Sequence, residues 1–141
     1  FSTLGPQVIK SLFKTVKERL GKIKNFPIQG KKIYLKKLTQ ANATKDYCNW
    51  LSDIKVNKYI RTKKGTIKSL REYILEKNKN PNCLFLGIFT RNTDKHIGNV
   101  KLEPIDWKSK KAGFGIMIGD KNYWGKRMAQ EAVRLITEYA F

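Results

Sequence analysis

Hydrophobic residues recur along this chain with two periods, one typical of helices and one typical of strands. From Pro6 to Gly21 the apolar residues lie one to four positions apart, at Val8, Ile9, Leu12, Phe13, Val16 and Leu20. Proline is tolerated in the first turn of a helix, and glycine is common just after its end. The pattern predicts an amphipathic helix with lysines on its polar side, which either packs on the domain or lies on a membrane or partner surface.

The next part of the chain predicts one strand and then helices. Apolar residues alternate with lysines over 31–38, which is the pattern of a half-buried strand. The stretch 42–51 has helical spacing, and its predicted apolar face comprises Tyr47, Trp50 and Leu51. Ser52 and Asp53 then offer an N-cap for a short helix that would end at Tyr59.

A third helix is expected over 67–78, after the cap residue Thr66. Its predicted apolar stripe comprises Ile67, Leu70, Ile74 and Leu75. Three apolar segments separated by turns follow at 83–90, 96–105 and 113–118, and these read as the strands of an antiparallel meander.

The last predicted element is a helix after Gly125, whose expected inner face comprises Ala129, Ala132, Val133, Ile136 and Ala140. A meander whose last strand leads directly into a helix predicts an α+β domain (an α/β sandwich), with a sheet flanked by helices. We therefore divide the chain into an N-terminal helical extension, 1–30, and one sheet-containing domain, 31–141.

Composition adds a large positive charge but little about the partner. The 141 residues include 30 Lys+Arg and 11 Asp+Glu, a net charge of +19. Such a balance suits nucleic acid, an acidic protein or a polyphosphate, and it says nothing about the fold. The excess is spread along the whole chain, so a general lysine bias explains it about as well as a dedicated RNA-binding patch.

The same composition argues against several classes of protein. No apolar run approaches the ~20 residues of a membrane-spanning helix. Cys48, Cys83 and a single histidine make neither a disulfide scaffold nor a metal site, so no metal is expected and a cytoplasmic setting is the default. The chain starts at Phe1 without a secretory signal and stops at Phe141 within a helical pattern, so we expect a processed or partial chain.

The segment after 113–118 holds the candidate chemistry. A short loop with Gly125 leads into a helix start that is flanked by Lys126 and Arg127. The first amides of a helix lack internal acceptors and carry positive potential, so two cations there are unfavourable for the helix alone. A bound anion such as a pyrophosphate would account for them. Ordinary solvated loop charges are an equal alternative on these grounds.

The run from Ile118 to Ala132 resembles the acetyl-CoA-binding signature of the GNAT superfamily of N-acetyltransferases. It is most similar to the Rim-like branch, which acetylates ribosomal-protein N-termini and whose run Tyr-Trp-Gly-Lys-Gly-x-Ala-x-Glu-Ala is matched from Tyr123 onward at all but Arg127. The segment 96–102 resembles the Ile-Gly strand of the family. The similarity extends in consistent order over 31–141.

The resemblance implies a mixed, mainly antiparallel sheet that splays apart to bind acetyl-CoA as co-substrate, and direct attack by an amine acceptor. The cofactor residues it implies are Ile116, Met117, Ile118, Trp124, Gly125, Lys126, Arg127, Met128 and Ala129. Glu103 is the candidate base, with a surface carboxylate as its alternative, and a structural role is favoured for Glu131. The family continues with another strand and helix, so we expect further sequence or a second chain, as in a homodimer, to complete the cleft.

Three functions remain open at this point. The first is an acetyl-CoA-dependent N-acetyltransferase that acts on a protein N-terminus or a small amine. The second is a basic nucleic-acid-binding module, although the sequence contains no recognised nucleic-acid motif. The third is a protein that keeps the CoA site and has lost catalysis.

Overall fold

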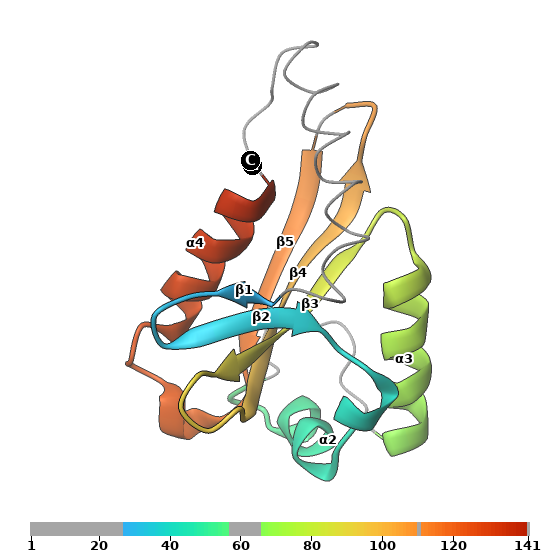
Figure 1. The fold of residues 1–141 in the computed structure, drawn as a ribbon. Helices are drawn as coiled ribbons and strands as arrows, with labels where there is room; N and C mark the ends of the chain where they lie inside the picture. The colour runs from blue at the N-terminus through green and yellow to red at the C-terminus, as the bar shows by residue number, and fades with distance from the viewer. Residues whose placement is uncertain (1–26, 57–65, 110, 141) are drawn as a thin grey trace.

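The computed structural model describes residues 27–56, 66–109 and 111–140 of the chain (Figure 1). The strands are β1 (Ile28–Gln29), β2 (Ile33–Lys37), β3 (Leu84–Thr90), β4 (His96–Asp106) and β5 (Lys111–Ile118). The helices are α2 (Lys45–Ser52), α3 (Ile67–Lys79) and α4 (Met128–Ala140), with short 3-10 turns η1 (Gln40–Asn42) and η2 (Lys121–Tyr123). The helix predicted after Pro6 lies outside the described residues.

The strands form one sheet whose spatial order, β1-β2-β3-β4-β5, is also their order in the sequence. Every neighbouring pair is antiparallel, so the described sheet is antiparallel throughout rather than mixed. All seven residues of β3 are buried, as expected for a central strand that is covered on both faces. The predicted α+β class and the predicted meander are confirmed.

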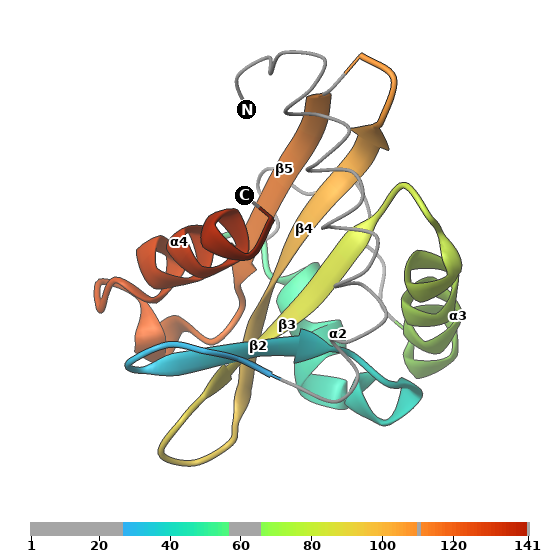
Figure 2. The same ribbon diagram turned by 45° about the horizontal axis from the view of Figure 1, so that its top comes forward.

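Helices cover both faces of the sheet, and each face has its own hydrophobic core. Helix α4 lies on one side of the sheet, and α2 and α3 lie on the other (Figures 1 and 2). The first core joins Met128, Ala132, Leu135 and Ile136 of α4 to sheet residues that include Leu86 and Val100. The second core joins Tyr47, Trp50 and Leu51 of α2 and Leu70 and Ile74 of α3 to the opposite face. The sheet is therefore the middle layer of three.

Hydroxyl side chains fix where α2 and α3 begin. The Thr66 hydroxyl accepts a hydrogen bond from the Ser69 amide, which confirms the predicted start of α3. In α2 the cap is Thr44, whose hydroxyl accepts from the amide of Tyr47. The helix predicted over 42–51 therefore begins later than expected, because its first residue belongs to the separate turn η1.

Asp53 ends α2 and does not begin the helix predicted after it. Its amide donates to the carbonyl of Trp50, which closes the last turn of α2. Its carboxylate accepts from the amide of Lys55 in a local turn. An aspartate side chain can accept hydrogen bonds from nearby amides at the start of a helix or in a turn that follows one. The sequence alone therefore did not show which of these roles Asp53 has. The rest of the predicted helix, to Tyr59, lies outside the described residues.

The buried face of α4 differs in part from the predicted face. Ala132 and Ile136 are buried as expected, but Val133 is 37% exposed. Met128 and Leu135 take the remaining core positions. Both sets of residues have helical spacing, so the choice depends on how α4 is rotated against the sheet.

Candidate functional site

Strand β5 forms one edge of the described sheet, and no described strand pairs with its outer side. In antiparallel pairs, the main-chain groups of successive residues alternate between facing the neighbouring strand and facing away. The Gly119 amide donates to the Ile97 carbonyl on β4 at 2.8 Å. By this alternation the main-chain groups of Ile118 and Ile116 face away from β4, whereas those of Met117 face it. Two of the three predicted strand residues thus present donors and acceptors at the edge.

The start of the loop after β5 is fixed by two tryptophans. The indole N–H of Trp124 donates to the carbonyl of Ile118 at 2.7 Å, so Trp124 folds back onto the end of the strand. On the other side, the ring of Trp50 fills the space that any side chain at Gly119 would need. The loop is therefore held against both the strand and α2.

Two ion pairs tie the same loop to neighbouring elements. Lys121 lies 2.6 Å from Asp53 at the end of α2, and a hydrogen bond from this lysine lowers the pKa of Asp53. Asp120 lies 2.7 Å from Lys95 in the β3–β4 turn. Burial tends to raise the pKa of Asp120, but its hydrogen bonds from Lys95 and from the Asn122 amide outweigh this and lower it. Sequence reasoning missed these contacts, because each pair joins segments far apart in the chain.

The turn before α4 contains two residues in the left-handed region of backbone space. Gly125 has a φ of 74° and Arg127 a φ of 62°. Glycine adopts this conformation freely, whereas a residue with a side chain loses about 1 kcal/mol. Lys126 and Arg127 are exposed beside the first amides of α4. The turn thus combines helix-start N–H groups with two cations, an arrangement that suits an anion.

The other two predicted cofactor residues, Met128 and Ala129, form the first turn of α4. Met128 is 7% exposed and packs into the core on the α4 side of the sheet, and Ala129 is half-buried. Their side chains are therefore directed to packing, and only their main-chain amides are suited to a ligand at the helix start.

Glu131 joins α4 to the β1–β2 hairpin. Its Oε2 atom accepts hydrogen bonds from the backbone amides of Lys32, at 3.0 Å, and Ile33, at 2.9 Å. A Cβ on Gly30 would lie 2.6 Å from the same oxygen, so only glycine fits the hairpin there. The Lys32 ammonium also donates to the carbonyl of Lys126 at 3.3 Å. These contacts agree with the structural role expected for Glu131, and they hold the hairpin against the turn before α4.

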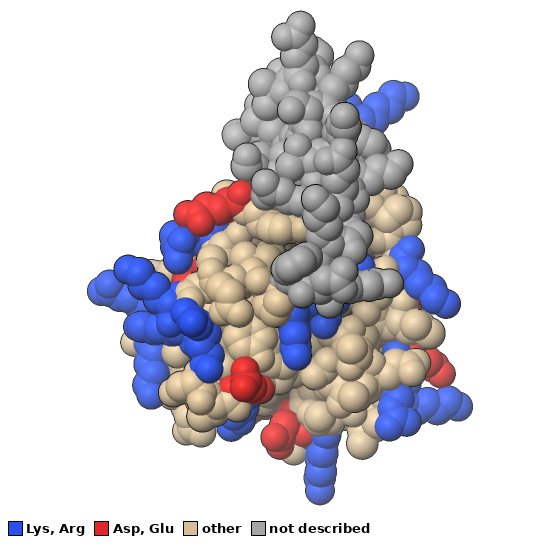
Figure 3. All heavy atoms as spheres, in the orientation of Figure 1, with Lys and Arg blue, Asp and Glu red and all other residues tan. Residues whose placement is uncertain are grey.

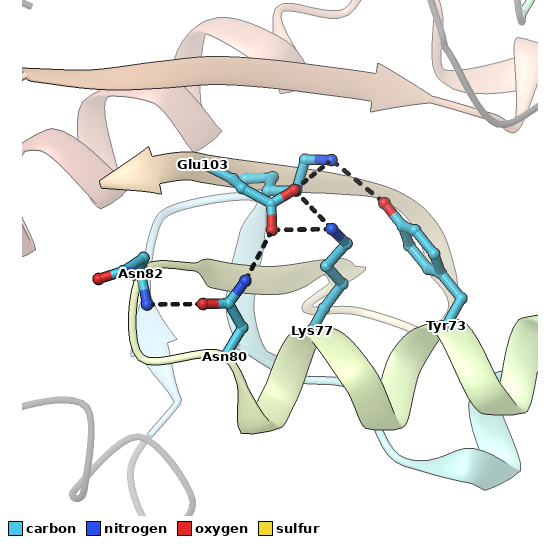
Figure 4. A network of polar contacts seen from close by, with 6 residues as sticks. Tyr73, Lys77, Asn80, Asn82 and Glu103 are labelled. Carbon is cyan, nitrogen blue, oxygen red and sulfur yellow. Dashed lines mark hydrogen bonds and ion pairs between the residues drawn. The ribbon is translucent and has the colours of Figure 1, made fainter. Parts of the chain in front are cut away.

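Glu103, the candidate base, lies on β4 and is held by side chains from α3 (Figure 4). The Lys77 ammonium donates to its two carboxylate oxygens at 2.6 and 2.8 Å, and the Asn80 amide reaches one of them at 3.4 Å. Lys101, two positions earlier on β4, lies 3.5 Å away. The side chain of Glu103 is only 17% exposed.

The surroundings of Glu103 keep it ionised. Burial tends to raise its pKa, but hydrogen bonds from Lys77 and Cys83 and the positive charges of Lys101 and Lys77 outweigh this effect, so the pKa lies below its ordinary value. Burial, followed by the nearby Glu103 charge, raises the pKa of Cys83 to about 12, so its thiol stays neutral. The role of Glu103 as a base stays a prediction.

Patterns in the sequence place the partners of Glu103 on the correct faces of their elements, although they do not select the pairing. Lys77 lies seven positions after Leu70 and three after Ile74, so it continues the buried face of α3. Lys101 falls between Val100 and Leu102, whose side chains enter the core on the α4 side of the sheet. Strand alternation then directs Lys101 to the opposite face, towards α3.

His96, the first residue of β4, lies among aromatic rings on the α2 side of the sheet. Its ring is 5.0 Å from that of Phe89 and 5.1 Å from that of Trp50, between ring centres. Its Nε2 atom lies 2.9 Å from the Gly98 carbonyl and 2.8 Å from Oδ1 of Asn99. Burial lowers the pKa of His96 although these hydrogen bonds act in the opposite direction. The neutral ring therefore serves as a packing element.

The comparisons with known proteins agree with this geometry. The family described as "Acetyltransferase (GNAT) domain" matches residues 32–141, which is most of the chain. The chain belongs to the GNAT acetyltransferase domain family. This membership puts it among the N-acetyltransferases, a class of acyltransferases that use acetyl-CoA.

Two relatives from bacilli carry the name of this activity. "Probable N-acetyltransferase YjcK" of Bacillus subtilis is 32% identical over 123 residues, which cover 81% of this chain and 67% of that protein. "Uncharacterized N-acetyltransferase p20" of Bacillus licheniformis is 30% identical over 102 residues, which cover 67% of this chain and 54% of that protein. The matched part thus spans about two thirds of one relative and about half of the other.

Solved structures of this fold differ in their acceptors. A Vibrio cholerae protein provisionally assigned as a ribosomal-protein-serine acetyltransferase has a TM-score of 0.68 at 18% identity and covers 84% of this chain and 68% of its own. Spermidine N-acetyltransferase from Vibrio cholerae, in complex with CoA and spermine, has a TM-score of 0.68 at 18% identity, covering 78% and 64%. FdhC, a nucleotide-linked sugar GNAT, has a TM-score of 0.64 at 25% identity, covering 81% and 65%.

The described helices and acidic, histidine and cysteine side chains also bear on membranes and metals. Within 27–56, 66–109 and 111–140, every helix is too short or too polar to cross a bilayer. Over the same residues, no three side chains among His, Cys, Asp and Glu come together as metal ligands.

Proposed function

We propose that this chain is an acetyl-CoA-dependent acetyltransferase domain that transfers an acetyl group to a primary amine, such as a protein N-terminus or a small amine. The proposal depends on three features that follow one another along the chain. They are the edge of β5 that no described strand pairs with, the turn at Gly125 and Arg127, and the first amides of α4. An extended chain of amide groups suits the first feature, and a pyrophosphate suits the other two. Acetyl-CoA carries both groups in this order.

In this arrangement the pantetheine arm bonds to the main chain from Ile116 to Ile118. The pyrophosphate lies against the turn from Trp124 to Ala129, where Lys126 and Arg127 balance its charge. Because the indole of Trp124 occupies the Ile118 carbonyl, an amide of the arm competes with this hydrogen bond.

The proposed reaction is direct attack of a neutral amine on the thioester carbonyl. A nitrogen–carbon bond forms and the carbon–sulfur bond breaks, the amine gives up a proton, and the leaving sulfur takes one. Glu103 is the proposed proton acceptor, directly or through a water molecule. Its low pKa keeps it ionised but makes it a weak base, and loosening of the Lys77 contact would raise its basicity. Outward-facing amides of β5 are suited to stabilise the oxyanion.

The names of the relatives support the reaction and leave the acceptor open. YjcK and p20 are both named N-acetyltransferases, whereas the structural neighbours include a spermidine enzyme and a nucleotide-linked sugar enzyme. We assign the chain to the Rim-like branch because of the run from Tyr123 to Ala132. The free, buried thiols of Cys48 and Cys83 support a reducing, cytoplasmic setting.

Two other functions remain as outcomes of the test. The net charge of +19 favours a nucleic-acid-binding module, but lysine and arginine side chains lie in several separate places on the visible face rather than in one patch (Figure 3). The ion pair between Glu103 and Lys77 favours a protein that binds CoA without catalysis. A homodimer is our proposal for completing the cleft if no further sequence does so.

The first test is titration of the chain with acetyl-CoA by calorimetry. We expect binding that is abolished by Gly125→Pro, since proline cannot adopt a positive φ. Lys126→Gln should weaken binding about threefold to tenfold by removing a charged phosphate contact. Lys108→Gln, at an exposed lysine of the β4–β5 turn, is the matched control and should bind as wild type.

Circular dichroism would establish that each variant is folded. A folded wild-type chain that does not bind acetyl-CoA would contradict the proposal, and so would binding that is unaffected by both Gly125→Pro and Lys126→Gln. Binding without acetyl transfer to any amine would favour the non-catalytic alternative. Binding to RNA that falls steeply with salt, without acetyl-CoA binding, would favour the nucleic-acid module.

A further inference from the structure

Lys77, Lys101 and Glu103 form a partly buried group with a surplus positive charge. Their side chains are 14%, 28% and 17% exposed. Glu103 receives two short hydrogen bonds from Lys77, whereas Lys101 is 3.5 Å away. Over the described residues, Glu103 is the only acidic side chain that forms an ion pair with either lysine. Two cations and one anion leave a net charge of +1.

Lys101 is the less well neutralised of the two lysines. An ammonium group has three N–H donors. Lys101 donates one N–H to the Tyr73 hydroxyl at 3.1 Å. A second N–H can point towards Glu103, which lies 3.5 Å away. The third N–H is then left for another acceptor. Tyr73 and Lys77 both project from α3 towards β4 (Figure 4).

Among the described residues, no side chain fills the position beside Lys101 on the neighbouring strand. Lys101 lies directly opposite Gly115 of β5, and opposed residues in an antiparallel pair project to the same face. A Cβ placed on Gly115 would meet no described atom within 4 Å. On the other face, Ile116 and Ile118 pack against the core beneath α4. Near Gly115, the face of β5 that carries Lys101 is therefore the side on which the described residues leave space for a second substrate.

We propose that Lys101 binds an oxyanion, a carboxylate or a phosphate, that belongs to the amine acceptor, while the rest of the acceptor lies over Gly115. This inference rests on the proposed acetyl transfer and adds the chemical class of the acceptor. A bound oxyanion accepts the third N–H of Lys101 and balances the charge of the group. A polycationic acceptor is disfavoured, because it would meet Lys101 while Glu103 is engaged by Lys77.

Packing alone does not account for both lysines. One cation is enough to pair Glu103, and Lys77 already does so with the shorter contacts. A second, partly desolvated cation weakens folding unless another anion compensates it. An acceptor that brings this anion explains why Lys101 lies partly buried beside Lys77, although one lysine is enough to pair Glu103.

The test compares amines that differ only in an anionic group. Phosphoethanolamine is paired with ethanolamine, and β-alanine with β-alaninamide, and kcat/KM is measured by release of the CoA thiol. The preference is the kcat/KM of the anionic amine divided by that of its neutral counterpart. Comparing this ratio between each variant and wild type cancels the intrinsic reactivity of the amines. We expect Lys101→Gln to reduce the preference at least about tenfold, as for loss of a partly desolvated charged hydrogen bond.

A second measurement does not depend on acetyl transfer. Binding of phosphoethanolamine is followed by broadening of its phosphorus NMR signal, with inorganic phosphate as competitor. Lys101→Gln should weaken this binding at least about tenfold, and Glu103→Gln should strengthen it because the group then carries +2. Lys108→Gln, which removes the same charge at the distant β4–β5 turn, should leave both measurements unchanged.

The outcomes separate this inference from the proposed function. If acetyl-CoA does not bind but phosphoethanolamine binds through Lys101, the proposed function fails and the oxyanion site stands. If acetyl-CoA binds and amines are acetylated without an anionic preference, or with one that survives Lys101→Gln, the inference is overturned and the proposed function stands. A purely structural role of Lys101 would lower stability in Lys101→Gln and leave the preference unchanged.

Discussion

Two glutamates near the proposed site are held by different kinds of partner. The Glu131 carboxylate accepts hydrogen bonds from the backbone amides of Lys32 and Ile33. These amides are fixed by the hairpin and carry no net charge. Glu103 forms ion pairs with the ammonium groups of two lysines. These groups lie at the ends of flexible side chains and can exchange one anion for another. Fixed, neutral donors therefore suit a structural carboxylate, whereas mobile cations can also bind an anionic ligand.

The largest effect is expected from Glu131→Ala. The substitution leaves the amides of Lys32 and Ile33 without their acceptor, so the free energy of unfolding should fall by about 2–3 kcal/mol. Urea denaturation measures this loss. The matched control is Glu138→Ala on the same helix, where an exposed i,i+4 pair with Arg134 is worth less than about 0.5 kcal/mol. Equal losses in the two variants would contradict the structural role of the Glu131 carboxylate.

A smaller effect is expected from the pH dependence of the Glu103 pair. Its folded-state pKa lies below the ordinary value of 4.5. Its contribution to stability is therefore present above pH 4.5 and is lost as the pH falls from 4.5 through the folded-state pKa. Urea denaturation between about pH 3 and 6 should show a flatter pH dependence in Glu103→Gln than in wild type.

Lys77→Met should flatten the same profile, because it removes the partner with the shortest contacts to Glu103. Both effects should be smaller than the loss at Glu131, since lysine partners near the surface are partly screened by water. Parallel profiles for wild type and both variants would mean that Glu103 has the same affinity for protons in the folded and unfolded chains.

The smallest effect is expected at Arg127, whose carbonyl accepts from the amide of Glu131. Arg127→Gly relieves the left-handed backbone and should raise the free energy of unfolding by about 0.5–1 kcal/mol. The loss of the guanidinium should at the same time weaken acetyl-CoA binding about threefold. Arg127→Lys keeps both the strain and the charge, so it should resemble wild type in both measurements. A less stable Arg127→Gly would show that the side chain stabilises the turn.

Most of the order of elements could be predicted from local patterns. Runs of apolar residues located β3, β4 and β5, and a hydroxyl before the apolar spacing located the start of α3. Which side of a helix is buried was harder, since Ile67 and Leu75 of α3 are 41% and 40% exposed although both fit the predicted stripe. Spacing gives the period of a helix, and its rotation is decided by the sheet.

The candidate site was predictable where it follows one continuous segment. Gly125 and its neighbours could be found because strand, turn and helix start adjoin in the sequence. The contacts of Trp50 with Gly119 and of Lys77 with Glu103 join separate elements, and no local pattern selects such partners. Their selection depends on how α2 and α3 pack on the sheet.

The bond between Glu131 and Ile33 also bears on how the chain acquires its structure. The two residues are 98 positions apart, and a contact of such long sequence separation is slow to form. On the ribosome, which makes a chain from its N-terminus, the hairpin that holds Ile33 emerges well before the carboxylate that completes it. Strands β1 and β2 therefore wait for α4, and their exposed amides are open to wrong partners in that interval.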